Sequence, residues 1–80
     1  MLISYDNDAK AMYITLLAEA RVAKTVEFNP DTYVDLTKKG ELIGIEMLNP
    51  NRSDLHRIAK KYRHPELFRI HPEKFLKAVA

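Results

Sequence analysis

The sequence predicts an α+β fold: an antiparallel β-meander of about five strands, then two or three short C-terminal helices packed on one face of the sheet. Apolar and polar residues alternate with a period of two through most of residues 2–48, as in half-buried strands. The period changes to that of a helix after the segment NPNRS. The loops between the predicted strands are too short for parallel crossovers, which indicates antiparallel pairing.

The first two strands are predicted from a short β run and an alternating run. LISY (residues 2–5) is followed by the turn-rich segment DNDAKA and then by MYITLL (12–17). In the second run Met12 and Ile14 share one face, whereas Tyr13 lies on the other. The two runs are expected to form a hairpin.

The third and fourth strands each carry an acid at an alternate position. In AKTVEF (23–28) Thr25 and Glu27 share one face, and the NPD segment that follows favours a chain reversal. In the next strand Val34 and Asp35 point to opposite faces. The acids therefore occupy positions that the alternation directs away from the core.

The fifth strand follows the turn KKG, in which Gly40 is expected to adopt a positive φ, as in short hairpin loops. In LIGIEML the period of two places Ile43, Ile45 and Met47 on one face. The opposite face then holds Leu42, Gly44, Glu46 and Leu48.

The helical segment is predicted from spacing and prolines. Ser53 is expected to cap a first helix, whose apolar stripe consists of Leu55, Ile58, Ala59 and Tyr62. His64-Pro65 ends this helix, because a residue before proline is disfavoured in the α region, and Pro65 opens a further helical turn. Pro72 is expected at the first position of a last helix, whose inward-facing residues are predicted to be Phe75, Leu76 and Val79.

The 80 residues are expected to form a single domain, with a sheet layer over residues 1–49 and a helical layer over 53–80. The net charge of +2 hides a division along the chain. Residues 1–51 hold five Lys/Arg against eight Asp/Glu, a balance of −3, and residues 52–80 hold eight against three, a balance of +5. This asymmetry indicates either attraction between the two layers or a basic surface for a polyanion.

The missing cysteine and the short apolar runs limit the kinds of chemistry and the cellular compartments that are expected for this protein. The chain has no cysteine, which excludes disulfides, thiolate chemistry and thiolate metal sites and fits a reducing compartment. The longest apolar run, AMYITLLA, is far shorter than the roughly 20 residues that span a bilayer, and MLISYDNDAK does not resemble an export signal. A soluble cytoplasmic protein without membrane contacts is expected.

The alternation brings six residues to one face of the predicted sheet, namely Tyr13, Thr25, Glu27, Asp35, Gly44 and Glu46. One interpretation is the solvated face that one-sided antiparallel sheets commonly keep. Another is a site for Mg²⁺ or Ca²⁺, which prefer carboxylate and hydroxyl oxygens. If the helices cover the face of Ile14, Val34 and Ile45, the acidic face is left for a partner or a second copy. Gly44 would then allow another backbone to approach.

The predicted first helix carries a second candidate surface. Opposite its apolar stripe lie the basic residues Arg57, Lys60, Lys61 and Arg63, a pattern typical of either solvated surface or phosphate contacts. The helix-break-helix arrangement resembles a helix-turn-helix only loosely, since its connection is longer than 3 to 4 residues and holds two prolines.

No catalytic residue, cofactor or metal site is predicted. The histidines at positions 56, 64 and 71 match no zinc-ligand spacing, and the only glycines lie in or beside a hairpin, unlike those of a phosphate-binding loop. No serine belongs to a recognisable nucleophile motif. The residues therefore favour a non-enzymatic protein.

The segments ISYD, AMYITL, KTVEF and VDLTKKGELIGIEML resemble the DUF2283 family of small bacterial and archaeal proteins of unknown function. The resemblance covers about the first 50 residues. The family pattern falls on Tyr5, Asp6, Tyr13, Ile14, Thr25, Glu27, Asp35, Gly40, Gly44 and Glu46. Family members often carry an acid just before the Tyr-Ile strand, where this chain has Lys10. The C-terminal segment lies outside this core.

The resemblance implies a compact, mainly antiparallel β domain and no catalytic residues. It also implies a small partner or antitoxin-like component, because such genes are sometimes found beside one for a small toxin-like protein. The leading hypothesis is therefore a non-enzymatic interaction module that binds another protein, itself, or both, and forms an oligomer through its sheet edges or its helical layer. The alternative is a nucleic-acid-binding protein that uses the basic face of the 53–63 helix. The second alternative is a divalent-metal-dependent enzyme that uses Glu27, Asp35 and Glu46.

Overall fold

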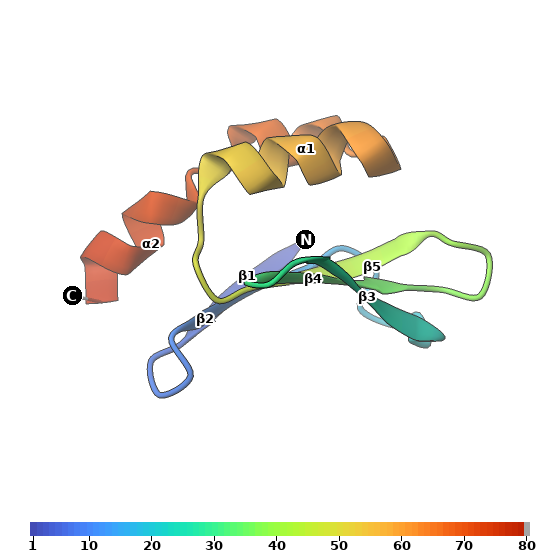
Figure 1. Ribbon diagram of the computed structural model, residues 1–80, viewed down its shortest axis with the longest axis horizontal. Coiled ribbons are helices and arrows are strands. Elements are labelled where there is room, and N and C mark those ends of the chain that lie inside the picture. Colours follow the sequence, from blue (N-terminus) through green and yellow to red (C-terminus); the bar gives the residue numbers. More distant parts are fainter. Residues whose placement is uncertain (80) are drawn as a thin grey trace. The chain divides into compact units, whose positions relative to one another are not determined.

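The computed structural model describes residues 1–79, and the side chains of residues 1–75 (Figure 1). The strands and helices follow one another along the chain as β1 (Leu2–Asp6), β2 (Ala11–Thr15), β3 (Lys24–Asn29), β4 (Thr32–Leu36), β5 (Leu42–Met47), α1 (Arg52–Tyr62), the 3₁₀ helix η1 (Pro65–Arg69) and α2 (Pro72–Val79). The predicted α+β class is confirmed, with five strands before the helices.

The chain divides into two compact units, Met1–Asn49 and the residues from Pro50 onward. This boundary coincides with the predicted change from strands to helices. The single domain proposed from chain length stays a prediction.

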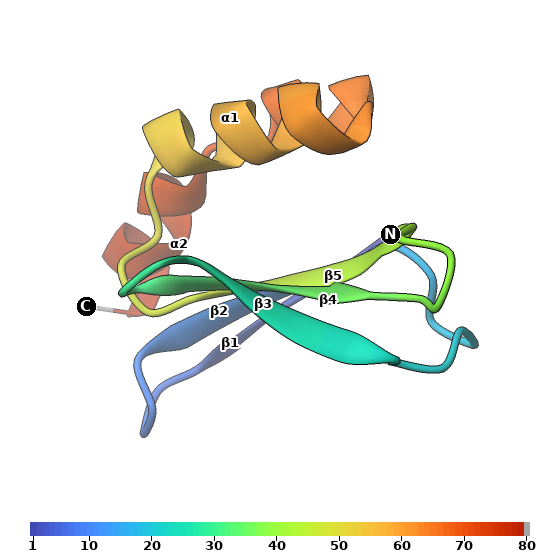
Figure 2. The same ribbon diagram turned by 45° about the vertical axis from the view of Figure 1, so that its right-hand side comes forward.

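The five strands form one twisted antiparallel sheet, but not in the order of a meander (Figure 2). The spatial order is β1-β2-β5-β4-β3, so the last strand of the chain occupies the centre and β1 and β3 form the edges. The predicted meander order is therefore wrong. It assumed that β3 pairs with the strand before it, whereas β2 pairs with β5. The arrangement of the last four strands is that of a Greek key.

The connection between β2 and β3 makes this order possible. The backbone N–H groups of Leu16 and Leu17 both donate to the carbonyl of Ile43, at 2.7 and 3.1 Å, the pattern of a β-bulge. Ala23 N–H then donates to the carbonyl of Leu36 at 2.9 Å. The connection thus follows the ends of β5 and β4 until it reaches the far edge.

Short polar side chains shape two of the hairpin turns, and a glycine shapes the third. An Asp6 carboxylate oxygen accepts from the N–H groups of Asp8 and Ala9, at 2.9 and 3.2 Å, in the turn after β1. The Asn29 side-chain oxygen accepts from Asp31 N–H at 2.9 Å after β3. Gly40 has a φ of +88°, which confirms the positive φ predicted for the last turn.

Most of the buried side chains of the sheet lie on one face, which we call the inner face. Its best-buried side chains are Met12, Ile14, Val34, Ile45 and Met47, each at most 2% exposed. Cross-strand pairs join them, such as Ile14 with Ile45.

Leu42 is also buried, at 1% exposure, although the alternation placed it on the opposite face. The reason is a register shift: Asp35 pairs with Gly44, but the next residue, Leu36, pairs with Leu42. Ile43 is therefore the extra residue of a bulge, and it changes the face of the residue before it.

Helix α1 begins at a cap other than the predicted one. The side chain of Asn51, not that of Ser53, accepts from the N–H of Asp54 at 2.8 Å. The helix ends at Arg63, which is left-handed with a φ of +60°. Its predicted apolar stripe is confirmed in part, since Leu55, Ile58 and Ala59 are buried and Tyr62 is half-buried.

The prolines act as predicted. Pro65 opens η1, which packs against α1, and Pro72 opens α2. Phe75 is half-buried, whereas the predicted orientations of Leu76 and Val79 lie outside the described side chains. No described helix has the length and apolar character needed to cross a membrane.

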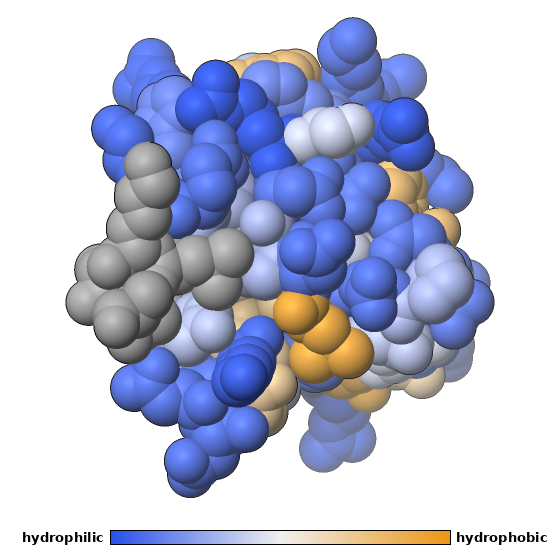
Figure 3. All heavy atoms as spheres, turned by 60° about the vertical axis from the view of Figure 1, so that its left-hand side comes forward, coloured by the Kyte–Doolittle hydropathy of each residue, from blue (hydrophilic) through white to orange (hydrophobic). Residues whose placement is uncertain are grey.

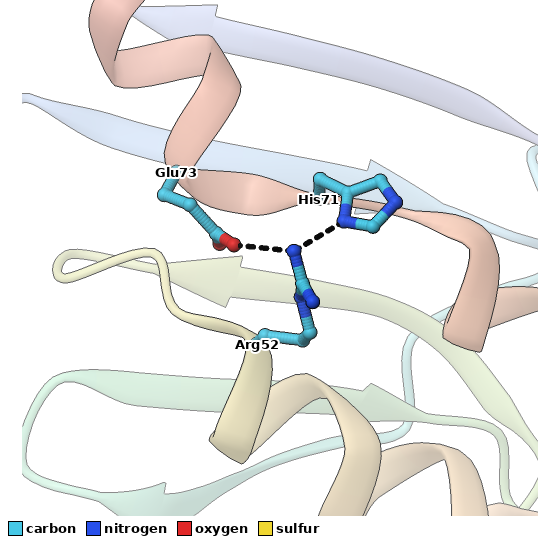
Figure 4. A network of polar contacts seen from close by, with 3 residues as sticks. All are labelled: Arg52, His71 and Glu73. Atoms are coloured by element: carbon cyan, nitrogen blue, oxygen red, sulfur yellow. Dashed lines mark hydrogen bonds and ion pairs between the residues drawn. The ribbon is translucent and has the colours of Figure 1, made fainter.

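A polar network links the beginnings of α1 and α2 within the second unit (Figure 4). One guanidinium nitrogen of Arg52 donates to a Glu73 carboxylate oxygen at 2.9 Å and to Nδ1 of His71 at 2.5 Å. The pKa of the Glu73 carboxyl lies below its usual value, mainly because its own backbone N–H donates to it, and further because of the Arg52 charge.

Candidate interaction surface

The face of the sheet opposite the inner face, which we call the outer face, holds two complete rows of cross-strand neighbours. The first row runs through Ser4, Tyr13, Glu46, Tyr33 and Glu27. The second row runs through Leu2, Thr15, Gly44, Asp35 and Thr25. All six residues of the predicted interaction surface therefore lie in two adjacent rows. The sequence assigned them to one face correctly, but the strand order decides which are neighbours.

Glu46 occupies the centre of the first row because β5 is the central strand. It lies opposite Tyr13 of β2 on one side and opposite Tyr33 of β4 on the other. Tyr13 is 38% exposed, and Tyr33 and Glu46 are each partly exposed. Two phenol rings thus flank one carboxylate at the middle of the outer face.

The carboxylate and the phenols interact differently on the two sides. The charge of Glu46 raises the pKa of the Tyr13 phenol above its usual value, and loss of hydration and a hydrogen bond to Glu46 raise it further. The Tyr33 hydroxyl instead donates to the carbonyl of Pro30 at 3.4 Å. Tyr13 therefore remains a neutral hydrogen-bond donor at physiological pH.

At the β3 edge the second row is joined by a side-chain hydrogen bond. The Thr25 hydroxyl donates to an Asp35 carboxylate oxygen at 2.5 Å, directly across the β3–β4 pair. Glu27, the next outer-face residue of β3, is exposed. Near the β3 edge the outer face thus carries a hydrogen-bonded carboxylate on β4 and an exposed carboxylate on β3.

Gly44 is buried and needs to be glycine because of its own sheet. A Cβ atom at this position would lie 2.9 Å from the carbonyl oxygen of Ile14, in the backbone of β2. The close approach predicted at Gly44 is therefore made by a neighbouring strand of the same chain. Approach of a partner at this position stays a prediction.

The outer face is negatively charged and mixed in polarity. Its ten residues include three carboxylates and no Lys, Arg or His. The side of the molecule drawn in Figure 3 is mainly hydrophilic, with separate small hydrophobic areas. Scattered apolar side chains of this kind are normal on soluble proteins. Its three carboxylates and the two tyrosines of the first row therefore distinguish the outer face.

The second candidate surface lies on α1. The predicted basic residues are all exposed, namely Arg57, Lys60, Lys61 and Arg63. His56 is different, because its ring lies 4.8 Å from that of Phe68 and its Nε2 atom is buried without a hydrogen-bond partner. The basic surface of the helix is thus formed by the lysines and arginines.

The described side chains contain no group of three or more His, Asp or Glu placed so as to hold a metal ion. Glu27, Asp35 and Glu46 share the outer face, but they belong to three strands. Tyr33 separates Glu27 from Glu46 within the first row, and Asp35 lies in the second row. The metal-dependent alternative thus finds no assembled ligand set among them.

Four outer-face residues were absent from the predicted surface although the rows include them: Leu2, Ser4, Thr15 and Tyr33. The alternation in TYVDL already placed Tyr33 beside the acids, so this residue could have been found from the sequence. Leu2 and Ser4 could not, because their neighbours in the rows depend on the register of β1 with β2, which the predicted hairpin does not give.

Comparison with known proteins gives one match. The model of the family described as "Protein of unknown function (DUF2283)" matches residues 2–49, which include all five strands and none of the helices. No curated protein and no solved structure matches the chain significantly. The family match extends over more than half of the 80 residues and includes both rows of the outer face, and the chain belongs to the DUF2283 family.

Proposed function

We propose that this chain is a non-enzymatic protein-interaction module of the cytoplasm, and that its outer face binds a basic segment of another protein. The observation that carries the proposal is the row in which Glu46 lies between Tyr13 and Tyr33. Tyrosine is enriched in protein interfaces because it combines a large apolar ring with a hydrogen-bonding group.

The chemistry of the outer face favours a partner rich in Lys or Arg. Glu27 and Glu46 supply charge, and the rings of Tyr13 and Tyr33 can accept a cation over their faces. An Arg side chain that reaches Glu46 would contact a carboxylate and two aromatic rings together. Such a contact explains why a sheet would carry an acid at its centre.

The extent of the family match supports the outer face over the basic helix. The match covers residues 2–49 and therefore includes the outer face but not α1. A function common to the family belongs to the shared part of the chain. The antitoxin-like role implied by the sequence resemblance is one form of this function, in which the bound protein is neutralised.

The test compares the protein captured by two variants in which an acid is replaced by lysine. One replacement lies on the outer face and the other lies outside it. Wild type, Glu27→Lys and Glu41→Lys are immobilised and exposed to extract of the native host. Glu27 and Glu41 are both exposed acids, but Glu41 lies in the turn before β5. We expect a protein that wild type and Glu41→Lys retain, that Glu27→Lys loses, and whose binding weakens as salt is added. Equal retention by all three variants, or no retained protein, would refute the proposal.

The second candidate is nucleic-acid binding, which the exposure of Arg57, Lys60, Lys61 and Arg63 favours. Phosphate contacts by these residues would release counterions, so the affinity should fall steeply with salt. A mobility-shift titration at several salt concentrations tests this, with Lys60→Glu/Lys61→Glu as the variant and Lys38→Glu/Lys39→Glu, in the exposed turn, as the matched control. An absence of any shift at low salt removes this candidate.

A further inference from the structure

The two edges of the sheet differ in how well they are protected against pairing. An unpaired edge strand offers a row of free backbone groups, which proteins commonly protect with bulges, prolines or charged residues. The β3 edge has such features: a register irregularity between Glu27 and Asn29, a lysine at its first position and Pro30 directly after it.

The β1 edge has no register irregularity, lysine or proline. All five of its residues pair with β2 in unbroken register, and LISYD contains no proline and no lysine. Its single charge is Asp6, at the last position, while Leu2 at the other end is 65% exposed. Of the two edges, β1 is therefore the one open to another strand.

The direction of the backbone groups follows from the hydrogen bonds of the neighbouring strands. Leu16 N–H donates to Ile43 C=O at 2.7 Å, so the backbone groups of Leu16 point toward β5. Groups two residues apart point the same way, and hence those of Ile14 also face β5. Tyr13, the adjacent residue, therefore directs its N–H and C=O toward β1.

Ser4 is opposite Tyr13 and directs its own backbone groups toward β2. Ile3 and Tyr5, on either side of Ser4, direct their N–H and C=O groups away from the sheet. The free edge thus presents two donors and two acceptors, placed symmetrically about Ser4.

We propose that two copies of this chain pair through β1 in antiparallel fashion, about a two-fold axis at Ser4, so that the two sheets become continuous. Ile3 of each copy then exchanges two backbone hydrogen bonds with Tyr5 of the other copy. Ser4 faces Ser4, and Leu2 faces Asp6, so no like charges are opposed. The period of two keeps the outer faces of both copies on the same side.

The symmetry of this edge argues for a second copy as the occupant. An isologous contact requires a surface that is complementary to itself, and a strand with free groups on either side of a central residue meets this requirement. The contact is short, so the dimer belongs to the small, transient class of interfaces and depends on concentration. This inference does not rest on the proposed binding of a basic partner.

Cysteine cross-linking tests the position of the axis. The chain has no cysteine, so Ser4→Cys introduces a single thiol. Non-hydrogen-bonded antiparallel neighbours have Cα atoms about 4.5 Å apart, within the range that a disulfide bridges. Thr25→Cys, on the outer face of the β3 edge, is the matched control. Under mild oxidation we expect Ser4→Cys to form a covalent dimer at least ten times faster than Thr25→Cys. Equal rates, or a faster control, would overturn the proposal.

Charge introduced at the same positions tests the dimer without any covalent bond. Ser4→Lys brings two lysines face to face, whereas Thr25→Lys places one at the other edge. Sedimentation equilibrium of wild type and Thr25→Lys should show a concentration-dependent mass that approaches twice 9.3 kDa. Ser4→Lys should remain at the monomer mass, with an unchanged circular dichroism spectrum. A wild type that is monomeric at every concentration, or a dimer that persists in Ser4→Lys, would contradict the pairing.

Discussion

Glu46 of β5 lies directly opposite Tyr13 of β2, and its negative charge is the largest cause of the raised pKa of the Tyr13 phenol. The substitution Glu46→Gln should therefore lower this pKa toward the ordinary value of 10.0. The measurement is an alkaline titration of tyrosinate absorbance, from which the curve of Tyr13→Phe is subtracted. The same subtraction in the Glu46→Gln background isolates the shift, and an unchanged midpoint would show that the two side chains do not interact.

The same pKa makes stability depend on pH at the alkaline end. Because the folded-state pKa of Tyr13 lies above its unfolded value of 10.0, its contribution is fully present below pH 10.0. It is lost as the pH rises through the folded-state pKa. Urea unfolding should show a smaller alkaline loss of stability for Tyr13→Phe than for wild type. A parallel decline in both proteins would contradict this prediction.

Gly44→Ala should destabilise the sheet unit. The new Cβ atom would lie 2.9 Å from the Ile14 carbonyl oxygen, which belongs to the backbone and cannot move aside as a side-chain end can. Overpacking of this kind costs roughly 1–3 kcal/mol in the free energy of unfolding, measured by denaturant titration.

Gly40→Ala is the natural comparison, because a Cβ atom there meets no atom within 4 Å. Its cost arises only from the positive φ of +88° and should be about 1 kcal/mol. Gly40→Asn should recover part of that loss, since Asn tolerates a positive φ better than Ala, whereas no such rescue is expected at position 44. A stable Gly44→Ala variant would show that β2 and β5 are farther apart than described.

Asn51→Ala should weaken α1, whereas Ser53→Ala should leave it nearly unchanged. The Asn51 side chain accepts from Asp54 N–H at 2.8 Å and donates to the Asp54 carboxylate at 2.9 Å. Loss of such a cap costs about 1 kcal/mol in the free energy of unfolding, measured by thermal or denaturant unfolding. Equal effects of the two alanines would mean that the cap lies elsewhere.

Glu73→Gln should destabilise the protein at neutral pH but not in acid. The pKa of Glu73 is lowered below its unfolded value of 4.5, so its contribution is complete above pH 4.5 and disappears as the pH falls through the folded-state pKa. Thermal unfolding of wild type and Glu73→Gln across this range provides the measurement. The two melting temperatures should converge at low pH, and a constant difference would contradict the assigned cause.

Local patterns were sufficient to predict most of the fold. The alternation around Asp35 and Glu46 gave the strands and the face of each acid, because a period of two is set by the strand backbone itself. The positive φ of Gly40 followed from its place in a short turn. The helix-opening positions of Pro65 and Pro72 followed from the fixed φ of proline.

The strand order and the register were beyond the reach of these patterns. Pairing of Ile14 with Ile45 joins segments far apart in the chain, and no local signal marks it. The bulge at Ile43, which buries Leu42, likewise depends on the strand beside it. In the predicted meander order β5 would be an edge strand, and Glu46 would have a neighbour on one side only. In the structure β5 is the central strand, and Glu46 lies between two tyrosines.

Because β5 joins the β1–β2 hairpin to β4 and β3, the sheet cannot close during synthesis until residue 47 has left the ribosome. Until then the nascent chain holds two separate hairpins, and isolated hairpins are at best marginally stable in water. A translation pause or chaperone that acts before residue 47 has emerged therefore acts on an incompletely folded chain, and a truncation before this residue leaves such a chain. After residue 47 has emerged, the complete sheet can form.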